Sequence, residues 1–246
     1  MVLERSEAGR LAYRQGSRIT AVWQWAIIAG MVVMAVYLLL LPFVARTWRA
    51  TGDEPHYLLA AHSVGIDGDL DLANNYANLD YLNFYFSRDI VRQVRLTESG
   101  QEILDHYPAL SVLVAPAYLI GGRFGVLLFQ TLFGGLLAAL MFYLAHLISE
   151  DTISSLLATA LVAFSLPLLA YPYLIYPEWL AAVLVTLVIF LLVTRTQPAA
   201  GVTVSLVVAL ALLPWLNRRF IPLAVLLAMT AVWIWRREGK RSAATV

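Results

Sequence analysis

The chain has 246 residues, of which 61% are hydrophobic and 13% are charged, and its mean hydropathy is +0.74. A soluble domain of this length carries more charge and shorter apolar runs, so the composition predicts a protein of the lipid bilayer. The formal net charge of +1 argues against a nucleic-acid partner, which requires a basic stripe. The absence of cysteine excludes disulfides and thiolate chemistry.

The first segment of the chain is basic. Arg5, Arg10, Arg14 and Arg18 precede an apolar run over Ala21–Val44. This run is too long for the apolar core of a signal peptide, and no pair of small residues marks a cleavage site. We therefore expect a retained membrane anchor whose basic end lies in the cytoplasm.

Apolar stretches that approach the roughly 20 residues of a membrane-spanning helix occur six times. In chain order they are Ala21–Val44, Phe124–Ile148, Thr152–Tyr171, Pro177–Thr194, Ala200–Leu216 and Phe220–Trp235. A further stretch, Leu110–Ile120, has about half that length and contains Pro116. We expect it to be a re-entrant or interfacial helix.

Charge at the C-terminus supports six crossings. Six crossings place both termini in the cytoplasm, where Arg236, Arg237, Lys240 and Arg241 obey the positive-inside rule. A seventh crossing would place this basic tail outside. The prediction is an all-α, multi-pass protein of the inner (plasma) membrane, with one domain over residues 1–246.

One large polar segment, residues 46–107, faces outward in this topology and has room for a site. Within it, Pro55–Val64 is expected to form a short amphipathic helix. The Asp67–Asp71 segment resembles the start of a calcium loop. However, Leu72 and Asn78 stand where an EF-hand has glycine and glutamate, so we expect a turn instead.

Two adjacent acids, Asp53 and Glu54, follow the first predicted span. A carboxylate at the membrane surface can act as a general base on an acceptor hydroxyl, or bind a divalent cation. Asp53 can also be the N-cap of a helix that begins near Glu54, with Pro55 in its first turn. The two roles are compatible.

Two further polar groups lie on the same predicted face of the membrane. Glu178 begins a predicted span, where it either serves function or complements the helix dipole. Asn217, Arg218 and Arg219 join two spans, and the arginines can hold a phosphate or pair with lipid headgroups. A base, a second acid and a phosphate clamp on one face indicate a transferase whose leaving group is a lipid-linked phosphate.

Short motifs spread along the chain carry a family resemblance. They are Gly52–Tyr57, Gly68–Leu72 with Asn74-Asn75, His106–Pro108, Leu113–Tyr118 with Gly121-Gly122, Tyr176–Glu178 and Leu213–Phe220. Together they resemble the GT-C-type membrane glycosyltransferases, the superfamily of protein O-mannosyltransferases and lipid A aminoarabinose transferases. The resemblance implies a polyprenyl-phosphate-linked sugar donor, inversion at the anomeric carbon and an acceptor at the outer face.

The resemblance also assigns roles to residues. It implies that Asp53, with Glu54 beside it, is the catalytic base. It implies a substrate-binding role for His106 or Tyr107, before the proline, and for Glu178. His56 of the first motif joins them as a candidate substrate-binding residue, with Asn217, Arg218 and Arg219 at the donor phosphate. No cofactor is expected beyond a divalent cation.

Several alternatives stay open at this point. Full-length relatives continue with more spanning helices and often a soluble C-terminal domain. We therefore expect a minimal enzyme, half of a complex whose protein partner supplies the rest, or a degenerate relative. The main rival is a non-catalytic membrane subunit that scaffolds a larger complex. A lipid or solute carrier is the weaker alternative, because carriers often have acids near the middle of the membrane and here the acids lie at segment ends.

Overall fold

The computed structural model describes residues 2–194 and 199–244, and side chains for residues 20–194 and 199–237. The α-helices are α1 (Val2–Thr47), α2 (Glu54–His62), α3 (Ala73–Ala77), α4 (Ala109–Ser149), α5 (Thr152–Ala163), α6 (Pro177–Thr194), α7 (Ala200–Leu216) and α8 (Ile221–Ala244). Short helical turns cover Ser63–Asp67, Asp80–Asn83, Tyr171–Tyr173 and Arg218–Phe220. The strands are β1 (Val94–Leu96) and β2 (Glu102–Leu104).

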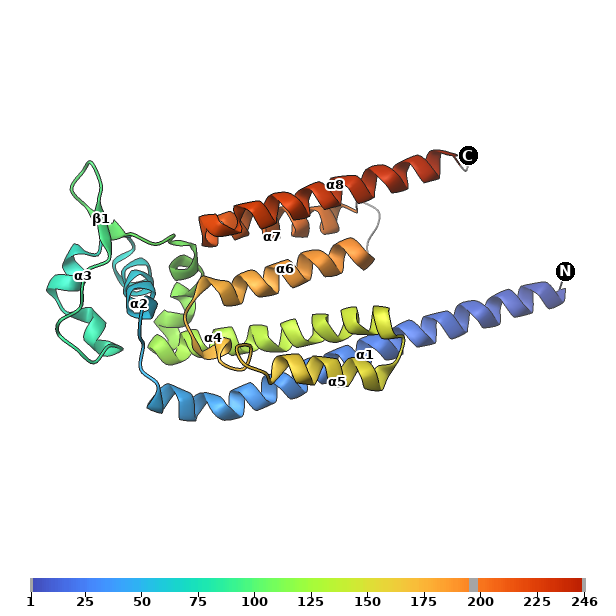
Figure 1. The fold of residues 1–246 in the computed structure, drawn as a ribbon, viewed down its shortest axis with the longest axis horizontal. Helices are drawn as coiled ribbons and strands as arrows, with labels where there is room; N and C mark the ends of the chain where they lie inside the picture. Colours follow the sequence, from blue (N-terminus) through green and yellow to red (C-terminus); the bar gives the residue numbers. More distant parts are fainter. Residues whose placement is uncertain (1, 195–198, 245–246) are drawn as a thin grey trace.

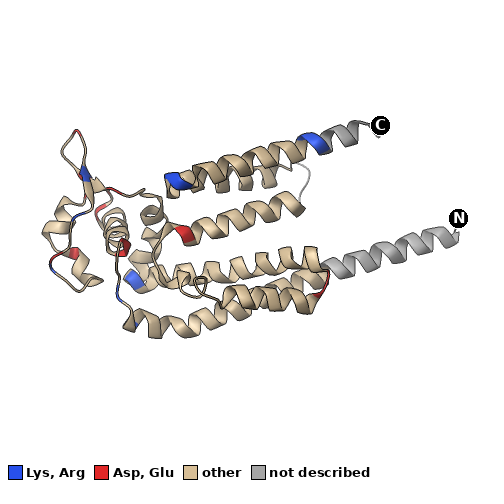
Figure 2. Cartoon of the chain, viewed as in Figure 1, with Lys and Arg blue, Asp and Glu red and all other residues tan. Residues whose placement is uncertain are grey.

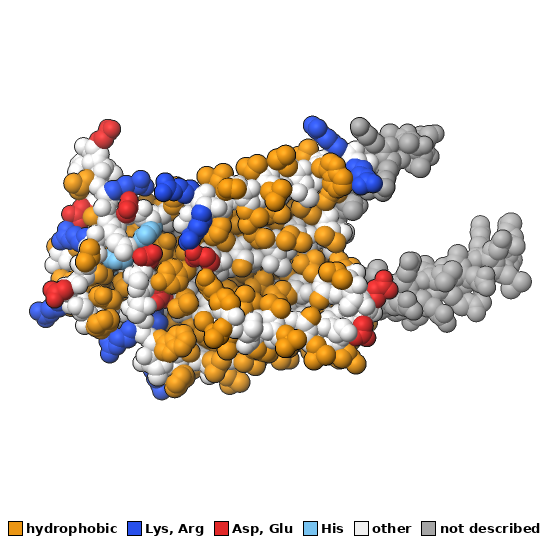
Figure 3. Space-filling view, viewed as in Figure 1, with side chains coloured by type: hydrophobic (Ala, Val, Ile, Leu, Met, Phe, Trp, Pro, Cys, Tyr) orange, Lys and Arg blue, Asp and Glu red, His pale blue; other side chains and the backbone are white. Residues whose placement is uncertain are grey.

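The long helices lie side by side, and the segment between α1 and α4 covers one end of the bundle (Figure 1). We call this the loop end. In the described part of the chain, four helices are long and apolar enough to cross a membrane: Thr20–Thr47, Ala109–Ser149, Pro177–Thr194 and Arg218–Arg237. Charged residues gather toward the two ends of the bundle (Figure 2), and apolar side chains cover its middle (Figure 3). This distribution is that of an all-α membrane protein.

Close packing of α1 on α4 forms the centre of the bundle. A Cβ atom on Gly30 would lie 2.5 Å from the Gly135 carbonyl oxygen, so only glycine permits this approach. Tyr37 of α1 also joins the neighbouring segments. Its hydroxyl donates to the Ala163 carbonyl at 2.6 Å, and the Tyr173 hydroxyl donates to the Tyr37 carbonyl at 2.8 Å.

A break divides α4 into two parts. Gly121 and Gly122 have non-helical dihedrals, and the φ of Gly122 is +54°, a conformation that favours glycine. Residues 109–120 are thereby separated from residues 123–149 by a kink. That Leu110–Ile120 is re-entrant or interfacial stays a prediction. The Phe124–Ile148 stretch, Pro177–Thr194 and Ala200–Leu216 are helical as predicted.

Helix α5 is shorter than predicted. The apolar pattern predicts a span over Thr152–Tyr171, but the helix ends at Ala163. Twelve residues extend only about 18 Å, less than the hydrocarbon core of a bilayer. The physical reason is Pro167, which lacks an N–H group and disfavours helical dihedrals in the residue before it.

The environment of α2 also differs from the prediction. We expected an amphipathic helix over Pro55–Val64, but residues 54–61 are all buried. The first part of α4 packs against this helix, and the Ser111 hydroxyl donates to the Tyr57 carbonyl at 2.9 Å. The prediction was wrong because it assumed that a loop helix rests on the surface with one face in water.

A β-hairpin, absent from the sequence prediction, precedes α4 in the chain. Its strands pair antiparallel, with Arg95 opposite Ile103. The Asp105 amide donates to the Gln93 carbonyl at 3.0 Å, which extends the hairpin to the residue before His106. The hairpin therefore brings residues 93–95 and 105–106 together at the loop end.

Candidate active site

A polar cleft of about 500 Å³ opens at the loop end of the bundle. The start of α2, the hairpin and the connections before α6 and before α8 form its walls. The lining residues are Asp53, Tyr57, Arg95, Asp105, His106, Tyr107, Tyr176, Asn217, Arg218 and Arg219. Six of the site residues predicted from the sequence thus meet in one cavity: Asp53, His106, Tyr107, Asn217, Arg218 and Arg219.

The Asp53 carboxylate faces the hairpin. Asp53 occupies the N-cap position of α2, but its side chain accepts no capping hydrogen bond. Instead, Asp53 Oδ1 accepts from Gln93 Nε2 at 3.3 Å and lies 3.7 Å from His106 Nε2. The capping role is therefore wrong for this side chain, and the carboxylate remains available to the cleft.

Gln93 connects Asp53 to His106. Its amide oxygen lies 2.6 Å from His106 Nε2, while its amide nitrogen donates to Asp53. An amide oxygen can only accept, so this bond requires a proton on His106 Nε2. The three side chains form a hydrogen-bonded chain that fixes the carboxylate and the imidazole at the edge of the cleft.

The two arginines differ in their partners. The Arg219 guanidinium donates to the Glu178 carboxylate, and the Arg219 amide donates to Asn217 Oδ1 at 3.1 Å. The Arg218 side chain is exposed and has no ion pair or hydrogen bond among the described residues. Arg218 is therefore the cation that a ligand can use, while Glu178 already neutralises Arg219.

A second uncompensated cation comes from the hairpin. The Arg95 side chain is exposed, lines the cleft and has no acidic partner within the described part of the chain. Its strand partner, Ile103, carries no charge. Asp105, which follows β2 in the same hairpin, is the second carboxylate of the cleft. The cleft therefore combines free cations with carboxylates, as a site for a phosphorylated substrate and acid–base chemistry requires.

Glu54 lies away from the cleft. It is buried, and its carboxylate accepts from the Thr51 amide at 2.9 Å and from the Ile175 amide at 2.8 Å. Burial raises the pKa of Glu54, against the opposing effects of these two hydrogen bonds and of the Arg123 cation. Glu54 thus holds the segment before α6 against the start of α2, and it does not share a site with Asp53.

His56 is not a lining residue either. It is buried, and its Nδ1 lies 2.9 Å from the Tyr76 hydroxyl. Burial lowers the pKa of His56 to about 4, and the nearby His106 acts in the same direction, against Asp53. The ring is therefore neutral at pH 7 and supports the loop from inside.

Two tyrosines complete the walls. The Tyr57 ring lies 5.3 Å from the His106 ring, and burial is the main cause that raises the pKa of the Tyr57 hydroxyl. The Tyr176 hydroxyl donates to the Thr51 carbonyl at 3.4 Å. Both tyrosines lie within the short motifs noted above, so the sequence contained a signal for their place in the site. Gln93, Arg95 and Asp105 had no such signal, because their position depends on how the hairpin pairs.

A metal centre is not apparent in the described residues. Among these residues, no three or more His, Cys, Asp or Glu side chains lie close enough together to hold a metal ion. The Asp67–Asp71 segment forms the predicted turn, in which the Asp67 carboxylate accepts from the Asn74 and Asn75 amides at 3.1 and 2.7 Å. We derive no chemical step through a divalent cation.

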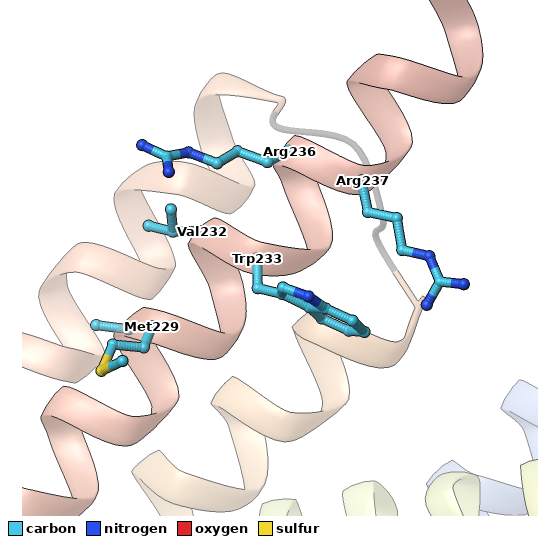
Figure 4. A pocket seen from close by; sticks show the side chains of 6 residues that line it. Met229, Val232, Trp233, Arg236 and Arg237 are labelled. Atoms are coloured by element: carbon cyan, nitrogen blue, oxygen red, sulfur yellow. The ribbon is translucent and has the colours of Figure 1, made fainter.

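Another cavity, of about 680 Å³, lies along α8 (Figure 4). Its lining is mainly apolar, with Met229, Val232 and Trp233 next to Arg236 and Arg237. It contains no acid or histidine, so it offers no group for acid–base chemistry. The polar cleft is therefore the candidate active site.

Comparison of the chain with protein-family models, with curated proteins and with solved structures finds no match.

Proposed function

We propose that this chain transfers a sugar from a polyprenyl-phosphate-linked donor to an acceptor hydroxyl at the non-cytoplasmic face of the inner membrane. The observation that carries the proposal is the cleft that Asp53 and His106 share with Arg218. The reaction needs a proton acceptor for the incoming hydroxyl and a cation for the departing phosphate. The short motifs that resemble GT-C-type glycosyltransferases support the same reaction.

In the proposed step, the acceptor oxygen attacks the anomeric carbon from the face opposite the phosphate. The bond between that carbon and the phosphate oxygen breaks, and its electron pair leaves with the polyprenyl phosphate. Asp53 takes the proton of the acceptor hydroxyl. Attack from the opposite face gives inversion. The hydrogen bond from Gln93 holds the Asp53 carboxylate in place, with His106 Nε2 at 3.7 Å from it.

Arg218 binds the donor phosphate in this proposal. Its fork of N–H donors matches phosphate oxygens, and no side chain in the described residues competes for it. Arg95 supplies a second positive charge from the hairpin. Glu178 acts indirectly: it orients Arg219 and limits the positive charge at this wall.

The proposal includes a topology with six crossings and both termini in the cytoplasm. The crossings are α1, residues 123–149 of α4, α5 together with the apolar residues that follow it up to residue 171, and the helices α6, α7 and α8, while residues 109–120 lie at the outer surface. Because α5 alone is too short to span a bilayer, its crossing includes the residues after the helix. Two observations support it. The start of α1 and the end of α8 lie at the same end of the bundle, opposite the loop end (Figure 1). Arg236 and Arg237 lie in the second half of α8, toward that end, as the positive-inside rule requires of a cytoplasmic side.

Turnover of a labelled donor tests the proposal. Membranes that contain the full chain are incubated with a panel of polyprenyl-phosphate-linked sugars, and release of polyprenyl phosphate is followed. We expect one donor to be consumed, and Asp53→Asn to slow its consumption by about 10²- to 10⁴-fold, the usual contribution of a general base. An equal rate for Asp53→Asn in a folded protein would rule out the mechanism.

The rival is a membrane subunit without catalysis that scaffolds a larger complex. It predicts that Asp53 and Glu178 tolerate substitution, and that a protein partner co-purifies with the chain. Consumption of no donor, together with a stable partner, would favour this rival.

A further inference from the structure

A second cluster of arginines lies at the loop end, in cavities other than the polar cleft. Arg46 and Arg49 follow the apolar part of α1, and Arg123 follows the break in α4. Two adjoining cavities of about 220 and 250 Å³ share Trp48, Arg49 and Arg123 in their linings, and Arg46 lines the larger one. None of these residues lines the cleft.

The cluster has an excess of positive charge. The one acid among the lining residues of these two cavities is Glu54. Its oxygens already accept from the Thr51 and Ile175 amides, at 2.9 and 2.8 Å. Within the described residues, the Arg46 and Arg49 side chains have no ion pair or hydrogen bond, and both are exposed. Two guanidinium groups therefore remain to be matched by an anion from outside the protein.

Arg123 provides a further donor. One of its terminal nitrogens donates to the Ala45 carbonyl at 3.2 Å, which holds the side chain against the end of α1. Its Nε is buried and has no partner in the described residues. A buried donor without a partner costs free energy, and an oxygen-rich ligand in the shared cavity would satisfy it.

The surroundings of the cluster fit a lipid better than a free anion. Trp48 and Phe124, each nearly half exposed, line these cavities, and Phe43 lies exposed on the preceding turn of α1. Tryptophan and other aromatic residues concentrate where the hydrocarbon core of a bilayer meets its headgroups. An acyl chain would contact these rings while its phosphate meets the arginines.

We infer that Arg46, Arg49 and Arg123 form a binding site for the phosphate headgroup of an anionic phospholipid, separate from the cleft. The guanidinium groups supply forked donors to the phosphate oxygens, and Trp48 and Phe124 contact the glycerol and the first part of the acyl chains. The inference does not depend on sugar transfer.

Phospholipid binding to the purified full chain in detergent tests this inference, with native mass spectrometry as the readout. The probes are phosphatidylglycerol and phosphatidylcholine with identical acyl chains. We expect the wild type to bind its first molecule of phosphatidylglycerol about tenfold more tightly than its first molecule of phosphatidylcholine. Arg46→Gln/Arg49→Gln should remove most of this preference and leave the binding of phosphatidylcholine unchanged. Arg46→Lys/Arg49→Lys, which keeps the charge but loses the fork, should retain an intermediate preference.

Arg236→Gln/Arg237→Gln is the matched control, because it removes the same charge beside Trp233 at the other end of the bundle. We expect it to change the preference less than about twofold. An equal loss in both double variants, or no preference in the wild type, would overturn the inference. Competition with glycerol 1-phosphate distinguishes a site for a lipid headgroup from a site for a free phosphate ester. We expect glycerol 1-phosphate not to displace phosphatidylglycerol. Full displacement would show that the site binds free phosphate esters.

Discussion

At the scale of single residues, Asp53 and Glu54 are neighbours with different surroundings. The Asp53 side chain is 40% exposed and lines the cleft, whereas Glu54 is buried and binds two backbone amides. The sequence alone could not separate them, because both acids follow the first span. Their difference arises from the start of α2, which turns consecutive side chains toward different sides of the loop.

Substitution of these two acids should separate stability from chemistry. Glu54→Gln removes the charge from two amide–carboxylate hydrogen bonds and leaves an amide hydrogen near one of the two backbone donors. We expect a loss of about 1–3 kcal/mol in the free energy of unfolding. Thermal unfolding in detergent measures this effect.

Asp53→Asn is the matched control, with the same chemical change one residue earlier. We expect it to change stability by less than about 0.5 kcal/mol, because the side chain is partly exposed and Asn can still accept from Gln93. If Asp53→Asn destabilises the protein as much as Glu54→Gln does, the two acids do not have the different roles described above.

At the scale of elements, the turn between α1 and α2 packs against the segment before α6. Gly52 has a φ of +58°, and a Cβ atom there would lie 2.6 Å from the Tyr176 hydroxyl oxygen. Gly52→Ala should therefore lower the free energy of unfolding by about 1–3 kcal/mol, through backbone strain and the clash together. Thermal unfolding of the purified variant provides the measurement.

Two further variants separate the strain from the clash. Gly68→Ala has the same kind of strain, with φ at +79°, but a Cβ atom there has no neighbour within 4 Å, so its effect should be smaller. Gly52→Ala/Tyr176→Phe removes the clashing oxygen and should recover part of the loss. If the Tyr176→Phe change recovers nothing, the close approach of these two segments is not what limits position 52.

The long apolar helices could be predicted from the sequence, and the short elements could not. The bounds of α6 and α7 agree with the apolar runs, because each run is mostly apolar and has a proline or a charged residue close to its ends. For α5, the apolar run predicts a helix that is too long. Apolar residues continue beyond Ala163, whereas the helix ends there, ahead of Pro167. Hydropathy reports how strongly a segment prefers an apolar environment, and it does not show at which residue a helix ends.

The candidate site, like the fold, could be predicted from the sequence only in part. Asp53, His106 and Arg218 were predicted to share one face because membrane topology alone brings the ends of spans together. Their contact through Gln93 could not be predicted, because it depends on the register of strands only three residues long. The pairing of Arg219 with Glu178 depends likewise on how α6 packs beside the turn before α8.

At the scale of the whole molecule, the proposed topology places the cleft and the α4–α5 turn on opposite sides of the membrane. The chain has no cysteine, so single cysteines can report this directly. Ser99, at the tip of the hairpin, and Ser154, at the start of α5, are both exposed. A membrane-impermeant maleimide should label Ser99→Cys in intact cells and Ser154→Cys only after permeabilisation. The reverse pattern would invert the proposed topology.

Binding of a polyprenyl phosphate to the purified protein tests whether the cleft binds a lipid-linked phosphate beside a separate base. The wild type is compared with Asp53→Asn and with Arg218→Ala/Arg219→Ala, after all three are shown to be folded. We expect saturable binding that Asp53→Asn retains and that the double variant weakens by at least about tenfold, as for loss of a charge-assisted contact. Absence of specific binding by the folded wild type, or equal binding by the double variant, would show that the cleft is not a site for a lipid-linked phosphate.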